Sequence, residues 1–419
     1  MNRVVALSLG IALWGITVGA EGQQRLTSLS LDEAVNLAAR QNPTLRAKEF
    51  ERQAVSANEI TAGLRPNPTL DLGAQQFAPG GPKAGGDVLD LTQYTVSVSQ
   101  TIELGGKRER RIGSARAATR VTGYELEDVR RQLLYLVKKS FTDGQTARDS
   151  LALADQNLAS LDDVERIQRV RAEKGDISEL ELLRIQVQRF AFERDAADAR
   201  QALRAAKIAL RSAMGGDQVA EDFEIVGELT IGEFSATPID LYRLALANRP
   251  DLRAAEAART KAAADIRLAR ANAWTDVTPG IQYQRIGPDN TIGVVLSLPL
   301  RIFDRNQGEI ARTRADEKRA AAAREAVAIQ ALADVDTALA ALGTERGKLT
   351  LLRDKYLVKA QQARDLTDYA YRRGGVSLLD FLDAQRAYRE TALEYVRALG
   401  NYWTSFYQLE AAVGSSLAP

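Results

Sequence analysis

The sequence predicts an α+β protein dominated by long α-helices, in which a helix, a β-hairpin and a long helical hairpin occur twice. Three observations carry this prediction: an internal duplication, two long proline-free stretches rich in helix-forming residues, and two pairs of segments in which polar and apolar residues alternate. We expect a signal peptide at residues 1–20, a first repeat at 21–236 and a second repeat at 237–419.

Short matching sequences reveal the duplication. Asn42-Pro43-Thr44-Leu45-Arg46-Ala47 matches Arg249-Pro250-Asp251-Leu252-Arg253-Ala254, an offset of 207 residues. The offset falls to 198 where Arg116 matches Arg314, and settles at 199 where Gly175 matches Gly374. The first drop, 207 − 198 = 9, gives the first repeat about nine additional residues around its strands. Both halves therefore share one structural plan.

The composition excludes several functional classes. The 419 residues carry 56 basic and 55 acidic side chains, so the chain lacks the basic excess of nucleic-acid-binding proteins. It has no His and no Cys, which removes an imidazole base, a thiolate nucleophile and a His/Cys metal cage. It also has no Gly-x-Ser-x-Gly elbow, phosphate loop or dinucleotide fingerprint. We expect no enzyme, no cofactor, no metal ligands and no nucleic-acid partner.

The N-terminus has the order of a secretory signal. Arg3 supplies a basic start, residues 4–18 are mostly apolar, and Val18-Gly19-Ala20 offers small residues for cleavage before Glu21. A buried N-terminal helix is the alternative. No Cys follows for lipidation, and no later stretch has the ~18 consecutive apolar residues of a helical membrane span. We expect a mature chain that stays soluble outside the cytoplasm or enters a membrane as β-strands.

Each repeat begins with two helices and a β-hairpin. The helices are expected at 31–40 and 43–64, and at 239–248 and 250–273, with proline tolerated in a first turn. Strands are expected at about 69–77 and 94–104, and at about 277–285 and 291–302. A half-buried soluble sheet is one interpretation, but each hairpin lacks a second sheet to cover its apolar face. Four strands cannot close a barrel, so hairpins that span a membrane require several chains.

Long helices make up the rest of each repeat. They are expected at about 107–173 and 178–214, and at about 307–373 and 377–413. A helix of this length extends on the order of 100 Å. Each hairpin turns at glycine, which adopts a left-handed conformation easily, and Ser178 and Ser377 are expected as N-caps.

This duplicated plan resembles the TolC-type outer-membrane efflux family over essentially the whole mature chain. The most specific segment is similar to the family's Tyr-Arg-x-Gly followed by Leu-x-x-Leu-Asp-Ala-Gln-Arg. It reads Tyr371-Arg372-Arg373-Gly374-Gly375-Val376-Ser377-Leu378-Leu379-Asp380-Phe381-Leu382-Asp383-Ala384-Gln385-Arg386. The first repeat echoes it at Glu173-Lys174-Gly175-Asp176-Ile177-Ser178-Glu179-Leu180.

The resemblance implies a homotrimer that pools four strands per chain into a twelve-stranded β-barrel in the bacterial outer membrane, surrounded by its lipid. The helices would continue the barrel as a periplasmic tunnel. A periplasmic adaptor and an inner-membrane RND pump would be the partners. The loops at 80–86 and 287–290 would face the exterior, and the glycine turns would form the periplasmic tip.

One junction resembles the cobalt-zinc-cadmium (CzcC-like) heavy-metal branch of the family. It reads Gln100-Thr101-Ile102-Glu103-Leu104-Gly105-Gly106-Lys107-Arg108, whereas the second repeat departs from it with Ile302-Phe303-Asp304-Arg305. The function expected from the resemblance is a passive outer-membrane conduit for heavy-metal cations. A channel for drugs and organic toxins or for type I secretion is the first alternative, and a secreted coiled-coil scaffold is the second.

Asp380 and Asp383 are the candidate pore residues. They stand three residues apart just past the tip turn, and hence on one helix face. In a threefold assembly they would form two rings of carboxylates, which favour cations at a constriction. The alternative is local: Asp380 interacts with the helix dipole and Asp383 forms a surface ion pair.

The remaining candidates also lie near the tip. Arg184 and Arg373 are expected as gate partners for these acids, although an arginine on a long helix is usually solvated. A last set is expected to form the tip turn and contact the adaptor: Gly175, Ser178, Gly374, Gly375, Ser377 and Leu379. The aromatic residues Tyr402, Trp403, Phe406 and Tyr407 are expected to pack in the middle of the tunnel, because they lie far from the strands.

Overall fold

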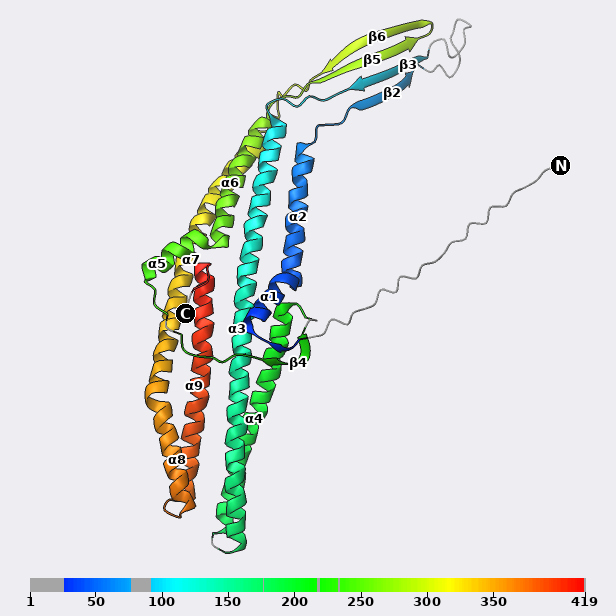
Figure 1. Ribbon diagram of the computed structural model, residues 1–419. Coiled ribbons are helices and arrows are strands. Elements are labelled where there is room, and N and C mark those ends of the chain that lie inside the picture. Colours follow the sequence, from blue (N-terminus) through cyan, green and yellow to red (C-terminus); the bar gives the residue numbers. More distant parts are fainter. Residues whose placement is uncertain (1–25, 77–91, 176, 217–218, 233, 418–419) are drawn as a thin grey trace, which may run out of the picture.

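The computed structural model describes residues 26–76, 92–175, 177–216, 219–232 and 234–417. The expected signal peptide and the expected exterior loop at 80–86 lie outside these residues. Within them the chain is elongated, with a β-sheet at one end, tight helical turns at the other and long helices between (Figure 1).

The two hairpins, far apart in sequence, join into one antiparallel sheet with the order β2-β3-β5-β6. The strands are β2 (Thr69–Gln75), β3 (Gln93–Ser99), β5 (Thr278–Ile286) and β6 (Asp289–Ser297). The joint between the repeats is the β3–β5 pairing, in which Val96 lies opposite Tyr283. Every residue of β6 is exposed in the single chain, including Ile292 and Val294. Such a sheet has no core of its own.

Two strands end five residues before their predicted boundaries. β3 ends at Ser99 rather than 104, and Ile102 makes only an isolated bridge to Val277. Beyond this bridge the chain leaves the sheet, and Gly105 and Gly106, both in left-handed conformations, lead into the next helix. β6 ends at Ser297 rather than 302; Pro299 comes two residues later, and it has no N–H to donate to a ladder.

The long helices are α3 (Lys107–Glu173), α4 (Glu179–Met214), α7 (Gln307–Leu351), α8 (Val358–Arg372) and α9 (Leu378–Val413). The helix expected at 307–373 is interrupted. A π-helical turn, Leu352–Leu357, joins α7 to α8. The corresponding helix of the first repeat, α3, is an uninterrupted α-helix.

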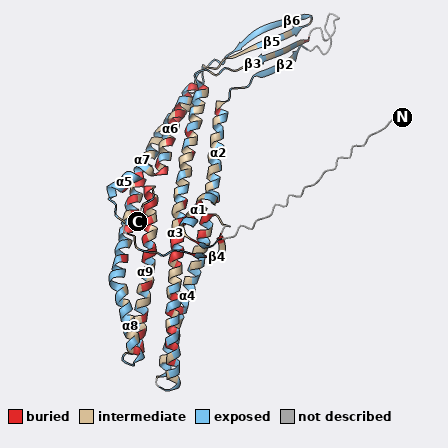
Figure 2. Cartoon of the chain, in the orientation of Figure 1, coloured by how far each residue is buried: buried red, intermediate tan, exposed pale blue. Residues whose placement is uncertain are grey.

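The shorter helices are α1 (Leu31–Gln41), α2 (Pro43–Gly63), α5 (Pro238–Asn248) and α6 (Pro250–Ala271). Next to the sheet, each helix contacts the next in the order α2, α3, α6, α7. Toward the turns the order is α4, α3, α9, α8. The chain is therefore a layer of helices, and many residues on the layer's faces and outer helices are exposed (Figure 2).

A second, two-stranded sheet was not expected. β1 (Leu26–Leu29) pairs in parallel with β4 (Val219–Ile225), near the middle of the helices. Val219, Phe223 and Ile225 of β4 are buried in a core with residues of α1, α3 and α4. The sequence pattern does not indicate β4, because this strand mixes three acidic residues with its apolar ones.

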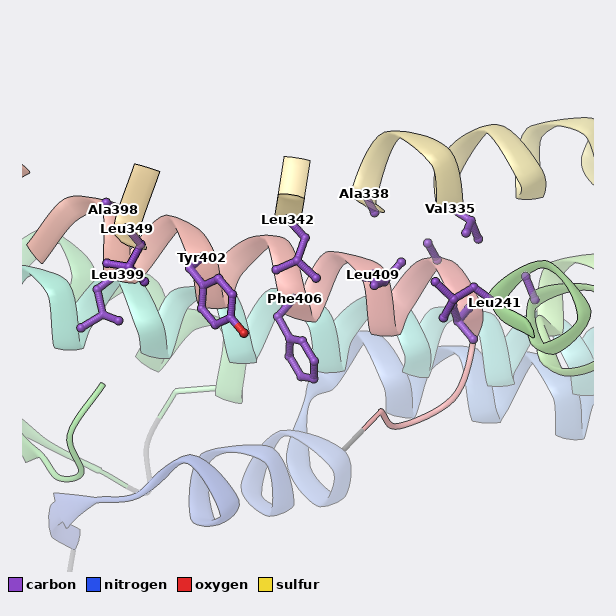
Figure 3. Packing of buried hydrophobic residues seen from close by; sticks show 13 residues of the cluster. Leu241, Val335, Ala338, Leu342, Leu349, Ala398, Leu399, Tyr402, Phe406 and Leu409 are labelled. Atoms are coloured by element: carbon purple, nitrogen blue, oxygen red, sulfur yellow. The ribbon is translucent and has the colours of Figure 1, made fainter. Parts of the chain in front are cut away.

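The aromatic residues near the chain's end pack in the largest core. Tyr402 and Phe406 of α9 are fully buried in a cluster with residues of α5 and α7 (Figure 3). Leu229, Ile231 and Phe234, of the segment after β4, pack against this cluster. The Tyr402 hydroxyl donates to the Gly232 carbonyl at 2.7 Å, and Trp403 Nε1 donates to the Thr230 carbonyl at 2.7 Å. This connecting segment thereby ties the first repeat to the second at mid-height.

One helix of the described chain is long and apolar enough to cross a membrane by composition. In Gln307–Arg372, an 18-residue window has a mean hydropathy of 1.4. Polar residues such as Asp334 and Asp336 interrupt this part of the helix, so it is not a run of ~18 consecutive apolar residues. The helix also has 66 residues against the ~20 of a span, and its apolar window is only 22% buried. It is an outer helix of the layer, which leaves much of its apolar surface uncovered.

Candidate functional site at the helical tip and the open edges

The two tip turns have the same backbone geometry. Gly175 and Gly374 have φ values of 78° and 76°, the left-handed region that a side chain disfavours. The Gly374 N–H donates to the Tyr371 carbonyl at 3.0 Å, and the Gly375 N–H donates to the Ala370 carbonyl at 2.9 Å. Open space surrounds the missing Cβ of Gly175 and Gly374. Glycine is therefore required at both positions by conformation and not by crowding.

Serine caps the helix after each turn, as expected. Ser178 Oγ accepts from the Glu181 N–H at 3.3 Å. Ser377 forms a full capping box: its Oγ accepts from the Asp380 N–H, and Asp380 Oδ2 accepts from the Ser377 N–H at 3.1 Å. These caps fix the direction in which α4 and α9 leave the tip.

Asp380 and Asp383 lie on the exposed side of α9. Phe381 and Leu378, between and before them, are buried. Both carboxylates have local partners: Asp380 belongs to the capping box, and Asp383 forms an exposed 3.0 Å ion pair with Arg386. The local interactions of the alternative interpretation are therefore present, and the acidic face is still open to solvent.

The proposed gate arginines do not reach these acids within the described part of one chain. Arg184 is exposed on α4. The Arg373 guanidinium stacks over the Tyr369 ring, 4.2 Å from its centroid. Leu379 is 62% exposed at the tip and does not belong to the buried cluster that the described residues form there.

The sequence analysis missed the contact between the two helical hairpins near the tip. Tyr371 and Phe381 stack with their ring centroids 4.9 Å apart. They share one buried cluster with residues of the other hairpin, namely Leu161, Val164, Ile185 and Phe192. Burial raises the pKa of the Tyr371 hydroxyl to about 12, and the nearby Glu181 carboxylate contributes. The helical spacing of these apolar residues indicated packing but not which helix they would face.

Polar side chains reinforce the same contact. Arg171 of α3 donates to the Arg372 carbonyl at 3.2 Å. Arg389 of α9 lies 3.5 Å from the Asp195 carboxylate and over the Phe192 ring of α4. The two hairpins are therefore joined at the tip by an apolar cluster and by two arginines.

At the other end, charged residues fix the sheet to the helices. Lys107 Nζ donates to the Asp276 carboxylate at 2.7 Å, and the Lys107 side chain is only 6% exposed. Arg111 binds both oxygens of Glu103, at 2.6 and 3.1 Å. Gly105 lies against Trp274, and a Cβ there would come within 2.7 Å of the indole. The junction therefore couples the strands of both repeats to α3.

Both the sheet and the helical layer have two outer edges that no other element of the described chain covers. In the described sheet, β2 and β6 each pair on one side only. The outer helices are α2 and α4 on the β2 side, and α7 and α8 on the β6 side. Near the tip both edges carry exposed apolar residues. They are Leu180, Leu183, Val187 and Phe190 on α4, with coiled-coil spacing, and Val358, Leu366 and Tyr369 on α8.

A sheet without a core, a layer of very long helices and two matching open edges define a class of protein: a protomer of a channel that continues a membrane barrel as a helical tube. A family comparison agrees. Residues 34–216 and 241–415 match the family model described as "Outer membrane efflux protein". The chain belongs to this family, and it is an outer-membrane efflux channel of the TolC type.

Two characterised relatives are metal-resistance proteins. The chain is 27% identical to the cobalt-zinc-cadmium resistance protein CzcC of Cupriavidus metallidurans, over 92% of this chain and 90% of CzcC. It is 26% identical to the nickel-cobalt-cadmium resistance protein NccC of Alcaligenes xylosoxydans xylosoxydans, over 72% of this chain and 67% of NccC. The pyoverdine export outer membrane protein OpmQ of Pseudomonas putida is 24% identical over 86% of this chain and 80% of OpmQ.

Solved structures have the same fold. The Campylobacter jejuni outer membrane channel CmeC matches with a TM-score of 0.78 and 15% identity, over 99% of this chain and 94% of CmeC. CusC, in a study of its folding and transmembrane channel formation, matches with a TM-score of 0.76 and 19% identity, over 93% of this chain and 94% of CusC. Across the residues that the structure describes, no group of three or more acidic side chains gathers as a metal site.

Proposed function

We propose that this channel exports heavy-metal cations, as the outer-membrane part of a tripartite system with a periplasmic adaptor and an inner-membrane RND pump. The observation that carries the proposal is the similarity to CzcC across 92% of the chain, strands and tip included. The chain has no His or Cys. A passive conduit does not need tight ligands, because tight binding would slow the release of its cargo.

The open edges support a homotrimer. Rotation about one axis brings β6 of one copy beside β2 of the next, with antiparallel direction retained, since the four strands alternate. The same rotation brings α7 to α2 and α8 to α4. Closure removes the unpaired strand edges, which lipid does not tolerate. Three copies of a four-stranded sheet give twelve strands, the assembly that the family resemblance implies.

The tip is proposed as the periplasmic entrance. Asp380 and Asp383 form two carboxylate rings there, and Arg184 and Arg373 reach these acids across copies and not within one. The exposure of both acids on a single face of α9 supports the rings. Gly175, Ser178, Gly374, Gly375, Ser377 and Leu379 shape the surface that the adaptor contacts. The 62% exposure of Leu379 supports this role.

A growth assay tests the cargo. A strain lacking the gene is grown across zinc, cobalt, cadmium, nickel and copper, and across dyes and antibiotics, with and without a plasmid copy. We expect sensitivity to metals alone, reversed by the plasmid. The match to OpmQ favours a second candidate, export of organic molecules such as pyoverdine. Sensitivity confined to organic compounds would move the protein to that function.

A further inference from the structure

The π-helical turn in the second repeat accounts for a change in the duplication offset. Arg148 donates to the Ile225 carbonyl at 2.6 Å, and Arg346 donates to the Phe234 carbonyl at 3.1 Å. These two arginines are 198 residues apart, whereas Gly175 and Gly374 are 199 apart. One extra residue therefore lies between Arg346 and Gly374. A π turn closes with i→i+5 hydrogen bonds and holds one residue more than an α turn.

The extra residue lies on the open α7–α8 edge and enlarges an exposed, basic surface. We define the π-turn surface by its exposed residues, Leu351, Arg353, Asp354, Lys355, Tyr356, Val358 and Lys359. Its three basic residues and one acid sum to 3 − 1 = +2. Arg353 pairs with Asp354, and the Lys355 ammonium lies over the Tyr356 ring. Lys359 and Lys355 have no carboxylate partner among the described residues.

A groove of about 540 Å³ borders the π-turn surface. It is lined by Gly343, Arg346, Gly347, Thr350, Leu351, Asp354 and Lys355. Nothing in the described chain lies within 4 Å of a Cβ built on Gly343 or Gly347. A glycine in a helix interior lowers helix stability, so two of them beside an empty groove indicate close approach by something outside this chain.

The opposite edge carries an acidic strand at the same height. The exposed side chains of Glu221, Asp222, Glu224 and Glu228, on and just after β4, sum to −4. Asp222 pairs with Lys207 of α4, which fixes β4 to that edge. The hydrogen bond from Arg148 of α3 to the Ile225 carbonyl places the end of β4 at the height of Arg148. Arg346 of α7 is the equivalent of Arg148 in the second repeat, so β4 and the groove beside Arg346 lie at a similar height along the helices. Figure 1 shows β4 and α7 on opposite sides of the chain.

We propose that the π-turn surface and its groove bind the acidic β4 region of a second copy of this chain, forming a belt of contacts between subunits at mid-height. The inference rests on the ring closure of the proposed function. It explains the insertion: α3 is covered by its own chain at this height, whereas α7 faces the next copy and carries the added turn. The opposite charges select this pairing over contact between two like edges.

Cross-linking of introduced cysteines tests the contact, because the natural chain contains no Cys. The double variant Glu224→Cys/Lys355→Cys is made in the full-length protein, and membranes are treated with a flexible bis-maleimide. We expect covalent dimers and trimers on a denaturing gel, and none from either single variant. Glu224→Cys/Arg319→Cys is the matched negative pair, because residue 319 lies 36 residues farther along the same edge helices, on the order of 50 Å away.

A second pair separates this contact from ring closure itself. Val187→Cys/Leu366→Cys joins the α4 and α8 edges near the tip. Cross-linking by this pair alone would overturn the β4 contact and leave the trimer intact; cross-linking by neither pair would overturn both. Lys355→Glu/Lys359→Glu should reduce the fraction of trimer extracted in detergent, and adding Glu221→Lys/Glu224→Lys to the same chain should restore it. Failure of this rescue would also contradict the proposal.

Discussion

Asn42 and Arg249, the residues before the matching prolines, hold the ends of the two return helices in the same way. Asn42 Nδ2 donates to the Ala213 carbonyl at 2.8 Å, and Arg249 Nη1 donates to the Ala412 carbonyl at 3.2 Å. The last carbonyls of a helix have no partner within it. Both repeats therefore satisfy one of them with the side chain that starts α2 or α6, which ties the tip hairpins to the helices next to the sheet.

Arg249→Ala should destabilise the protein strongly. Arg249 is 4% exposed and binds Asp251 at 2.6 Å and Asp334 at 2.8 Å. Burial favours a raised pKa for Asp251, but the bonds from Arg249 outweigh it and lower the pKa. Removing the arginine takes the hydrogen-bonded cation from both carboxylates and leaves Asp251 with Arg131 at 3.9 Å, at a cost of about 2–4 kcal/mol. Thermal melting of the detergent-solubilised protein checks this.

The control for that variant is Arg243→Ala. Its ion pair with Asp240 is exposed on both sides and contributes little. We expect the melting temperature of Arg243→Ala to stay near that of the wild type. Equal losses in the two variants would contradict the role assigned to Arg249.

Gly374→Ala should weaken the tip turn. The left-handed conformation costs a side chain about 1–2 kcal/mol, even though no atom crowds the site. Gly123→Ala is the matched control, because Gly123 lies in the α3 interior with open space and no positive φ. The control should stabilise the protein by up to about 1 kcal/mol. We expect the melting temperature to fall in Gly374→Ala and to rise in Gly123→Ala. A higher melting temperature for Gly374→Ala would contradict the turn geometry.

Asp383→Asn should lower the cation selectivity of the channel and raise its conductance, because it weakens a carboxylate ring at the entrance. Asp380→Asn should act in the same direction but also loosen the capping box, so Asp383 gives the cleaner test. The reversal potential in planar bilayers under a salt gradient measures selectivity. Glu390→Gln, an exposed acid farther along α9, is the control. Unchanged selectivity in the double Asp380/Asp383 variant would remove these residues from the pore.

Arg184→Ala should increase the current through the closed channel if Arg184 pairs with tip acids of a neighbouring copy. Within its own chain Arg184 is exposed, so the variant should fold normally. Single-channel recording measures the closed-state current. An unaltered current would leave the contacts of Arg171 with the Arg372 carbonyl and of Arg389 with Asp195 as the polar links at the tip.

Alkaline conditions should destabilise the folded protein. Burial raises the pKa of Tyr371 and of Tyr407 to about 12, above the value of about 10 in an unfolded chain. This stability is fully present below about pH 10 and is lost as the pH rises toward about 12, because only the unfolded state releases these protons there. Melting curves against pH should show the loss, and it should be smaller in Tyr371→Phe/Tyr407→Phe.

The sequence was sufficient for features that depend on local chemistry or on the duplication. Glycine at the end of each long proline-free stretch predicted the turns at Gly175 and Gly374. The serines that follow, Ser178 and Ser377, predicted the N-caps of the two return helices. The alternating residues predicted strands, although a ladder's end depends on partners that periodicity does not specify. For this reason the sequence predicts an end for β3 at residue 104, whereas the strand ends at Ser99.

The missed features depend on contacts between distant segments. β1 pairs with β4, Leu26 opposite Val219, and the acidic residues of β4 conceal its buried face. The stack of Tyr371 on Phe381 required the register of two helices. The π turn was detectable only as a change of one residue in the duplication offset, a signal that gains its meaning from the bonds of Arg148 and Arg346.

The open edges of the sheet and of the helical layer require copies of this chain to close into a ring. The most direct test is the mass of the native complex extracted from outer membranes in detergent, with the bound detergent subtracted. We predict a mass three times that of one chain, which is 45.7 kDa, or slightly less per chain if the expected signal peptide is cleaved. A monomer that leaves the membrane fraction without detergent would contradict the channel assembly.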